Sequence, residues 1–269
     1  MRVNFVKMHG SGNDYLFFDC FGAPLRDPSR VARLLCRRHF SVGGDGIMLI
    51  LPSDVADVKM RIFNADGSEG KTCGNALRCL GRLLYDWGFI RKSRMKIETN
   101  SGVREVFLII KNGIVSSVGV DMGTYHLDEM FFLEICGEKL EMRGVEIGNM
   151  HQVTFLPDVD VLDLNKIGGL CEKNPRFDDG VNTEFCEILE KNLIKARVFE
   201  RGSGETLACG SGACAIGAAS VANGSSDASE PIRIIMRGGE LSVKIDENMR
   251  ATLFGGAQKC FEGMADLDI

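Results

Sequence analysis

Two cysteines are the residues of this sequence best suited to acid–base chemistry. Each is followed by glycine, in Cys73-Gly74 and Cys209-Gly210, and each precedes a segment with a helical pattern. A thiol at the start of a helix lies beside unpaired backbone N–H groups and the positive end of the helix dipole, and both lower its pKa. Such a thiol can take or give a proton near neutral pH. The same N–H groups can hold a carboxylate.

The two Cys-Gly pairs belong to an internal duplication. Cys73 and Cys209 are 136 residues apart (209 − 73), and at this offset five of fourteen positions are identical between 61–74 and 197–210. About one identity would be expected by chance from average residue frequencies. The identical pairs are Arg61 and Arg197, Phe63 and Phe199, Glu69 and Glu205, and the two Cys-Gly pairs. The duplication predicts two similar lobes around a pseudo-twofold axis, with one thiol on each side of the cleft between them.

The elements that must position the thiols are mostly strands. Short apolar or alternating runs bounded by Gly, Asn and Asp predict strands at 3–8, 14–19, 47–50, 58–63, 95–99, 104–110, 114–120, 152–156, 184–189, 194–199, 232–236 and 241–245. Helical patterns cover 28–39, 74–87, 160–172 and 210–222. The expected fold class is α+β, with two pseudo-symmetric lobes, each a mostly antiparallel sheet wrapped around a central helix. The first lobe is expected at 1–115, with 258–269 returning to it, and the second at 116–257.

Composition excludes several classes of protein. The chain has 269 residues, a net charge of −5 and 45% hydrophobic residues, which indicates a globular protein with no basic face for nucleic acid. No signal peptide or membrane span is evident, so the expected location is the cytoplasm. The ten cysteines lack the spacing of a metal site, and no metal is expected. Apart from Cys73 and Cys209, we expect them to be buried free thiols.

Two opposed thiols suit the inversion of a stereocentre. One thiolate would remove a proton from one face of a carbon, and the opposite thiol would return a proton to the other face. The two helix ends would stabilise the charge that moves onto an adjacent carboxylate when the proton leaves. Because the two sulfurs would share one charge, their titration should belong to the pair. No cofactor is needed for this chemistry.

At these residues the chain resembles the diaminopimelate epimerases, cofactor-independent enzymes that interconvert L,L- and meso-diaminopimelate on the route to lysine and peptidoglycan. The matching segments are HGSGNDY (9–15), GGDG (43–46), RIFNADGSEGKTCGNALRC (61–79), GNMH (148–151), GVNTEF (180–185) and ERGSGETLACGSGA (200–213). The two-cysteine arrangement recurs in related racemases on the same two-lobed fold. The resemblance implies an isomerase whose substrate is a small amino acid with two carboxylates. A homodimer is also expected.

The resemblance also assigns residues. It implies that Cys73 and Cys209 are the acid–base thiols, and that His151 and Glu200 bind the α-ammonium group and support the thiols. The reacting carboxylate would be held by Gly74, Asn75, Gly210 and Ser211. The rest of the pocket would be lined by Asn13, Asn64, Asn149, Asn182 and Arg201, with Arg201 the bidentate partner of the distal carboxylate. Met150 replaces the proline usual in GNPH, and Ser211 stands where Thr is common. The first change leaves another amino acid open as the substrate.

Two hypotheses from other classes compete. Residues 65–72, ADGSEGKT, imitate a phosphate-binding loop between a strand and a helix, as in a nucleotide-binding ATPase or kinase. Against this, Asp66 and Glu69 would put carboxylates beside polyphosphate, and the second copy has no equivalent Lys-Thr. A non-catalytic amino-acid-binding protein is the other alternative. It would need only one helix-end site, and it would not exchange the α-proton of a bound amino acid with solvent.

Overall fold

The computed structural model describes residues 1–267. The fold is mixed α/β: most of its elements are strands, and the described residues contain four helices. The described chain divides into two compact units. One comprises Met1–Val120 together with the C-terminal segment that begins at Gly255, and the other comprises Asp121–Phe254.

The first unit is a mixed sheet with two helices. Its elements are β1 (Arg2–Gly10), β2 (Asn13–Asp19), α1 (Pro28–Leu35), β3 (Gly46–Leu51), β4 (Val58–Asn64), β5 (Glu69–Gly70), α2 (Gly74–Asp86), β6 (Arg94–Thr99), β7 (Gly102–Lys111), β8 (Ile114–Thr124) and β18 (Gln258–Asp266). The strands pair in the order β18-β1-β2-β3-β4-β6-β7-β8, with β5 also on β4. Among the pairings described for this unit, β2–β3 and β4–β6 are parallel.

The second unit repeats this plan. Its elements are β9 (His126–Ile135), β10 (Glu138–Ile147), β11 (Asn149–Phe155), α3 (Leu164–Glu172), β12 (Asn182–Glu190), β13 (Leu193–Glu200), β14 (Gly204–Thr206), α4 (Gly210–Ala222), β15 (Ile232–Met236), β16 (Gly239–Ile245) and β17 (Arg250–Gly255). The described pairings run β9-β10-β11-β12-β13-β15-β16, with β14 also on β13. Here β11–β12 and β13–β15 are parallel.

The elements of the two units correspond at the offset of 136 residues. The bounds of β11 and α4 are those of β2 and α2 moved by this offset. The pairing register agrees as well, because Tyr15 lies opposite Gly46 in the first unit and His151 opposite Asn182 in the second. Each position in one unit can therefore be compared with its equivalent in the other, and the thiols occupy equivalent positions.

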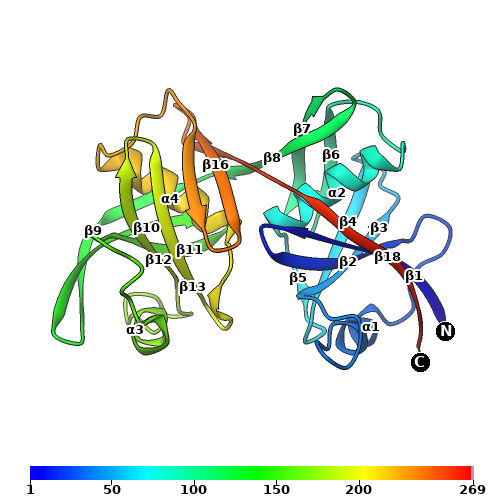
Figure 1. The fold of residues 1–269 in the computed structure, drawn as a ribbon, viewed down its shortest axis with the longest axis horizontal. Helices are drawn as coiled ribbons and strands as arrows, with labels where there is room; N and C mark the ends of the chain where they lie inside the picture. Colours follow the sequence, from blue (N-terminus) through cyan, green and yellow to red (C-terminus); the bar gives the residue numbers. More distant parts are fainter. Residues whose placement is uncertain (268–269) are drawn as a thin grey trace. The chain divides into compact units, whose positions relative to one another are not determined.

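Each unit packs its longest helix against its sheet (Figure 1). Helix α2 contacts β1, β2, β7 and β18, and α4 contacts β10, β11, β12, β15 and β16. Helix α4 is built almost entirely of small and apolar residues, and Ala213, Ile216 and Ala219 are buried in the core of the second unit. Gly217 lies so close to the sheet that an added Cβ would meet Val243 Cγ1 at 3.0 Å. The small residues thus let the helix approach the sheet closely and fix where it begins.

Two predicted helices are too long. The helix expected at 28–39 ends at Leu35, because the chain turns back there: Gly43 N–H donates to the Leu35 carbonyl, and His39 has a φ of 70°. The helix expected at 160–172 begins at Leu164. The preceding carbonyls of Val159 and Leu162 accept hydrogen bonds from the guanidinium of Arg197 and are unavailable to a helix.

The strands β9 and β10 were missed by the sequence prediction. They form a hairpin in which Leu140 lies opposite Leu133. Many of their side chains are exposed, and the apolar alternation is interrupted by Glu and Lys. A strand that faces solvent along much of its length carries little of the period-two signal on which the prediction depends.

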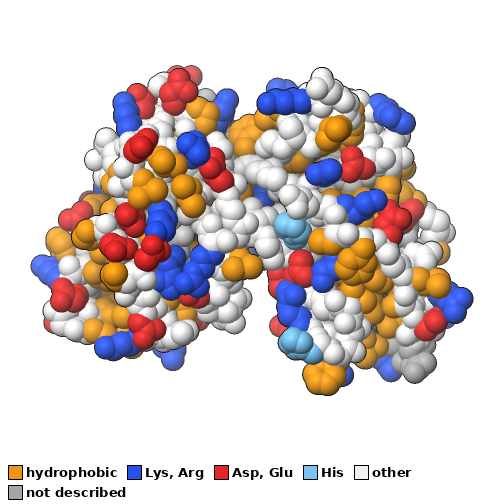
Figure 2. All heavy atoms as spheres, viewed as in Figure 1, with side chains coloured by type: hydrophobic (Ala, Val, Ile, Leu, Met, Phe, Trp, Pro, Cys, Tyr) orange, Lys and Arg blue, Asp and Glu red, His pale blue; other side chains and the backbone are white. Residues whose placement is uncertain are grey.

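The surface shows both signs of charge, and two of the cysteines are not buried as expected. Positive and negative side chains are interspersed on the face shown in Figure 2. Of the eight cysteines expected to be buried, six are, but Cys136 and Cys260 are exposed. Within residues 1–267 no helix has the length and apolar character needed to cross a bilayer. In the same part of the chain, no three His, Cys, Asp or Glu side chains gather as metal ligands would.

Candidate active site

Cys73 ends the loop that leads into α2 in the first unit. Its backbone is extended, with φ −148° and ψ 119°. Its sulfur lies 3.4 Å from the Tyr15 hydroxyl and 3.5 Å from Asn13 Oδ1. Burial raises the pKa of the Cys73 thiol, while the Tyr15 hydroxyl and the backbone N–H groups of Ala76 and Asn75 act in the opposite direction. Burial raises the pKa of Tyr15 well above its usual value. The hydroxyl therefore keeps its proton and can donate it to a Cys73 thiolate.

The side-chain amide of Asn13 is held in one orientation. Its Nδ2 donates to Asp45 Oδ2 at 2.7 Å, and Asp45 is itself bound by Arg38 at 2.9 Å. A carboxylate only accepts hydrogen bonds, so the amide nitrogen must face Asp45 and Oδ1 must face the thiol. Asn75 Nδ2 also donates to Asn13 Oδ1, at 3.2 Å. This network fixes the position of an acceptor for the S–H of Cys73.

Cys209 occupies the equivalent position before α4 in the second unit. Its backbone is also extended, with φ −120° and ψ 120°. The sulfur accepts the backbone N–H of Gly212 at 3.4 Å and lies 3.5 Å from Ser211 Oγ. Burial and the carboxylates of Glu200 and Glu184 raise the pKa of the Cys209 thiol well above its usual value, against the smaller effects of Ser211 and Gly212. The negative neighbours distinguish this thiol from Cys73.

Titratable side chains, two of them buried and one half-buried, lie around Cys209. His151 Nδ1 lies 2.7 Å from Glu184 Oε1, and both side chains are fully buried. Glu200 is bound by the Thr206 hydroxyl and by the Cys209 thiol. Burial raises the pKa of Glu200, and Glu184 raises it further, while Thr206, Cys209 and His151 lower it. A thiol, an imidazole and two carboxylates thus meet within the second unit.

The expected depression of the two thiol pKa values is wrong for the protein without a ligand. The N–H groups at the helix starts do favour the thiolates, but burial outweighs them at Cys73 and at Cys209. Desolvation disfavours the charged form of any acid, and a helix end compensates only in part. Both groups are therefore poorer thiolates than the sequence predicts.

The structure brings Asn182 and Arg201 together in the second unit. Arg201 N–H donates to Asn182 Oδ1 at 2.9 Å, and Asn182 lies opposite His151 in the pairing of β11 with β12. The guanidinium of Arg201 donates to the Asp179 carbonyl at 2.9 Å and is exposed. Because Arg201 is exposed and has further N–H donors, it can bind a carboxylate as well.

Other predicted site residues have less distinctive surroundings. Gly74 and Gly210 are the buried first residues of α2 and α4. Asn64 Nδ2 donates to Ser68 Oγ at 3.0 Å in the turn between β4 and β5, which is the ordinary turn role of asparagine. Asn149 is the exposed first residue of β11.

Sequence reasoning missed Tyr15, Asp45 and Glu184. A signal for Glu184 was present, since it is a charge within the otherwise uncharged run VNTEFC of a predicted strand. The duplication could have pointed to Tyr15, because the offset places it on His151. Asp45 lies in a loop, and its contact with Asn13 comes only from the folded sheet.

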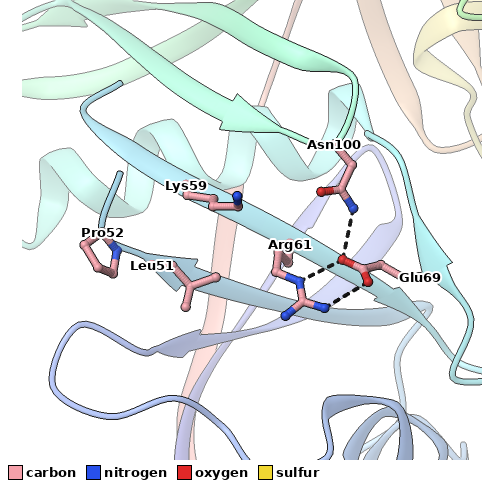
Figure 3. A pocket seen from close by; sticks show the side chains of 6 residues that line it. All are labelled: Leu51, Pro52, Lys59, Arg61, Glu69 and Asn100. Atoms are coloured by element: carbon pink, nitrogen blue, oxygen red, sulfur yellow. Dashed lines mark hydrogen bonds and ion pairs between the residues drawn. The ribbon is translucent and has the colours of Figure 1, made fainter. Parts of the chain in front are cut away.

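The segment that imitates a phosphate-binding loop folds differently. Strands β4 and β5 form a hairpin at this segment, in which Phe63 lies opposite Glu69. The carboxylate of Glu69 is bound by Arg61 at 2.8 Å and 2.9 Å. Figure 3 shows this pair beside a pocket of about 510 Å³ lined by Leu51, Pro52, Lys59, Arg61, Glu69 and Asn100. A hairpin with a paired carboxylate does not wrap its N–H groups around phosphate, and the nucleotide-binding alternative is dropped.

Comparison with known proteins shows the family of the chain. The family model described as "Diaminopimelate epimerase" matches residues 5–127 and 144–260. The chain belongs to the diaminopimelate epimerase family. A relative of that name from Acetivibrio thermocellus is 41% identical over 99% of both chains. Another, from Methanococcus maripaludis strain S2, is 41% identical over 98% of this chain and all of its own. Membership of this family makes the protein an isomerase.

Solved structures share the fold at much lower identity. A probable proline racemase from Agrobacterium radiobacter K84 has a TM-score of 0.78 at 16% identity and covers 99% of this chain and 93% of its own. A phenazine biosynthesis protein of the PhzF family from Bacillus anthracis has a TM-score of 0.77 at 16% identity and covers 99% and 100%. The fold is that of the diaminopimelate epimerases and their structural neighbours.

Proposed function

We propose that the protein is a diaminopimelate epimerase that converts L,L- to meso-diaminopimelate, a precursor of lysine and peptidoglycan, without a cofactor. The observation that carries the proposal is the repeated thiol: each unit ends a loop with a cysteine at the start of an equivalent buried helix. A binding protein would need neither thiol. Full-length relatives at about 40% identity support the choice of substrate.

The proposed reaction uses the two thiols on opposite faces of one α-carbon. A thiolate removes the α-proton, and the C–H electron pair moves onto the adjacent carboxylate. The second thiol then gives its S–H proton to the other face of the same carbon and becomes the thiolate. Net charge is conserved, and the enzyme returns with the roles of Cys73 and Cys209 exchanged. The backbone N–H groups of the helix starts stabilise the carboxylate charge during the step.

The surrounding residues suit a zwitterion with a second carboxylate. Gly74, Asn75, Gly210 and Ser211 begin the two helices and would hold the reacting carboxylate. His151 and Glu200, both in the buried cluster, would bind the α-ammonium group. Arg201 is exposed, with donors for the distal carboxylate. Asn13, Asn64, Asn149 and Asn182 would complete the pocket.

The test is proton NMR in deuterated buffer with L,L-diaminopimelate and no added cofactor. We expect the α-proton signal to be replaced by deuterium as the meso isomer forms. Replacement of Cys73 or Cys209 by Ala should slow inversion by at least about a hundredfold, the lower range for loss of an acid or base. Cys260→Ala, at an exposed cysteine, is the matched control. Retained epimerisation by Cys209→Ala would exclude the mechanism. A panel of other amino acids tests whether Met150 changes the substrate.

Three further expectations belong to the same proposal. The division into lobes at 1–115 with 258–269 and at 116–257 stays part of the proposal. A cytoplasmic location is proposed on the free cysteines, which suit a reducing compartment. A homodimer is proposed because β18 exposes Phe261 and Met264, by 46% and 57%. Light scattering on the purified protein tests the last expectation, and a monomer would contradict it.

A further inference from the structure

The pair formed by His151 and Glu184 lies on two neighbouring strands of the second unit. His151 is on β11 and Glu184 on β12, and the two strands run parallel, with Val153 opposite Glu184. The imidazole Nδ1 and the carboxylate Oε1 are 2.7 Å apart. Both side chains are fully buried. The family resemblance assigned a role to His151 but none to Glu184.

The hydrogen bond between His151 Nδ1 and Glu184 Oε1 is the basis of the inference. With the carboxylate as the acceptor, Nδ1 donates its N–H to Glu184. In the neutral imidazole the other nitrogen, Nε2, is then an acceptor. Nε2 is buried and has no hydrogen-bond partner within residues 1–267. A buried polar atom without a partner is costly, and its partner can be a group of the ligand.

Helix α4 is shaped to accept the Glu184 carboxylate. A Cβ at position 212 would lie 2.6 Å from Glu184 Oε1 and 3.2 Å from Cys209 Cβ, so Gly212 leaves the space that the carboxylate occupies. Gly212 is in the first turn of α4, where the helix dipole stabilises a negative charge. This packing places the pair directly against the turn that carries the thiol.

The charges of this cluster select a cation. Glu184 and Glu200 are carboxylates near Cys209, and the described cluster contains no Lys or Arg contact to either. In the tautomer with its proton on Nδ1, His151 offers a lone pair at Nε2. A protonated amine can donate to that lone pair and to a carboxylate at the same time, whereas the carboxylate of the ligand is assigned to the backbone N–H groups at the helix start.

We infer that Glu184 is a positioning residue for substrate binding: it keeps the proton of His151 on Nδ1 and presents Nε2 as the acceptor for the α-ammonium group. The inference rests on the proposed function for the identity of the ligand. The arrangement of the proton on His151, by contrast, is a property of the protein alone and can be measured without any substrate.

The first measurement is the tautomer of His151 in the substrate-free protein. The chain has four histidines, so nitrogen-15 labelling of histidine and long-range proton–nitrogen correlation resolve each ring. We expect His151 to carry its proton on Nδ1. A proton on Nε2 would overturn the inference, because Nε2 could then not accept a hydrogen bond from an ammonium group. This result does not depend on whether diaminopimelate is turned over, so it separates the inference from the proposed function.

The second measurement uses Glu184→Gln, which keeps the shape but can donate an N–H to Nδ1. We expect the tautomer of His151 to shift toward Nε2 and KM for diaminopimelate to rise by about 10- to 100-fold, as for the loss of a hydrogen bond to a charged group. Glu190→Gln, at the exposed end of the same strand, is the matched control and should change neither. A KM within about twofold of the wild type, which corresponds to less than about 0.5 kcal/mol, would overturn the inference. If the variant does not fold, the wild-type tautomer still decides it.

Discussion

The two copies of the duplicated unit contain the same ion pair in different surroundings, and this makes a stringent test of burial. In the second unit Arg197 Nε lies 2.8 Å from Glu205 Oε1, and the side chains are 8% and 16% exposed. In the first unit Arg61 Nε lies 2.8 Å from Glu69 Oε1, and the side chains are 37% and 32% exposed. Both pairs are bidentate. The Arg–Glu geometry is thus matched and solvent exposure differs, while Glu205 also contacts the exposed Arg237 at 3.0 Å and Glu69 also accepts from Asn100 at 2.9 Å.

The perturbation is Glu205→Gln, with Glu69→Gln as its control. The first removes the charge that offsets a buried guanidinium, and loss of one partner of a buried pair costs about 3–5 kcal/mol. Arg197 keeps some solvent exposure, and its Nη1 still donates to two backbone carbonyls. We therefore expect a loss of stability near the lower end of this range, at about 3 kcal/mol. The exposed pair is worth no more than about 1 kcal/mol.

Thermal and urea unfolding followed by circular dichroism measure the two losses. At about 2–4 °C per kcal/mol, Glu205→Gln should lower Tm by about 6–12 °C and Glu69→Gln by no more than about 4 °C. Equal shifts in the two variants would refute the reasoning, since burial would then not decide the value of the pair. Replacing the buried pair by Arg197→Met and Glu205→Leu together should restore most of the stability, because the only charge that loses its partner, Arg237, is exposed to solvent.

Three other predictions concern the site and acid stability. The Tyr15 hydroxyl lowers the pKa of Cys73, so Tyr15→Phe should shift the pH profile of Cys73 alkylation to higher pH; an unchanged profile would contradict the contact. Gly212→Ala should displace Glu184, which costs about 1–3 kcal/mol, while the higher helix propensity of Ala returns about 1 kcal/mol. Urea unfolding at unchanged m measures the net change in stability. A fully active, equally stable variant would show that the space left by Gly212 is not needed. Burial raises the pKa of Asp14, but the hydrogen bonds from Arg38 and Lys7 outweigh burial and lower the pKa below its ordinary value. The stability that this pKa shift contributes is present above the unfolded pKa of about 3.9 and is lost as pH falls below it. Asp14→Asn should flatten this part of a profile of Tm against pH, and an unchanged slope would contradict the prediction.

The sequence predicted the part of the architecture that repeats. The offset between the Cys-Gly pairs located α2 and α4, and the repeated Arg and Glu positions proved to be ion pairs in both units. Equal spacing in two copies is evidence that does not depend on local propensity. Helix bounds failed where tertiary contacts overrode the local pattern, as where Arg197 binds the carbonyls before α3.

The positions of the two cysteines were predicted better than their electrostatics. Cys73 and Cys209 do begin helices, which a sequence motif can indicate. The direction of their pKa shifts was wrong, because it depends on how much water the fold removes and on which charges lie nearby. Glu184 belongs to GVNTEF (180–185), one of the segments that carry the family resemblance. Its contact with His151, however, arises from the pairing of two strands about thirty residues apart, and no local pattern encodes that pairing.

The last strand, β18, has a consequence for synthesis on the ribosome. It pairs antiparallel with β1, so the two ends of the chain complete one sheet. All of Asp121–Phe254 is translated before this strand appears. The second unit can therefore acquire its native structure while nascent β1 still lacks one neighbour and presents an open edge, the kind of edge at which unfinished chains associate. Chaperone dependence during translation should accordingly fall on the amino-terminal half and end only when the final residues emerge.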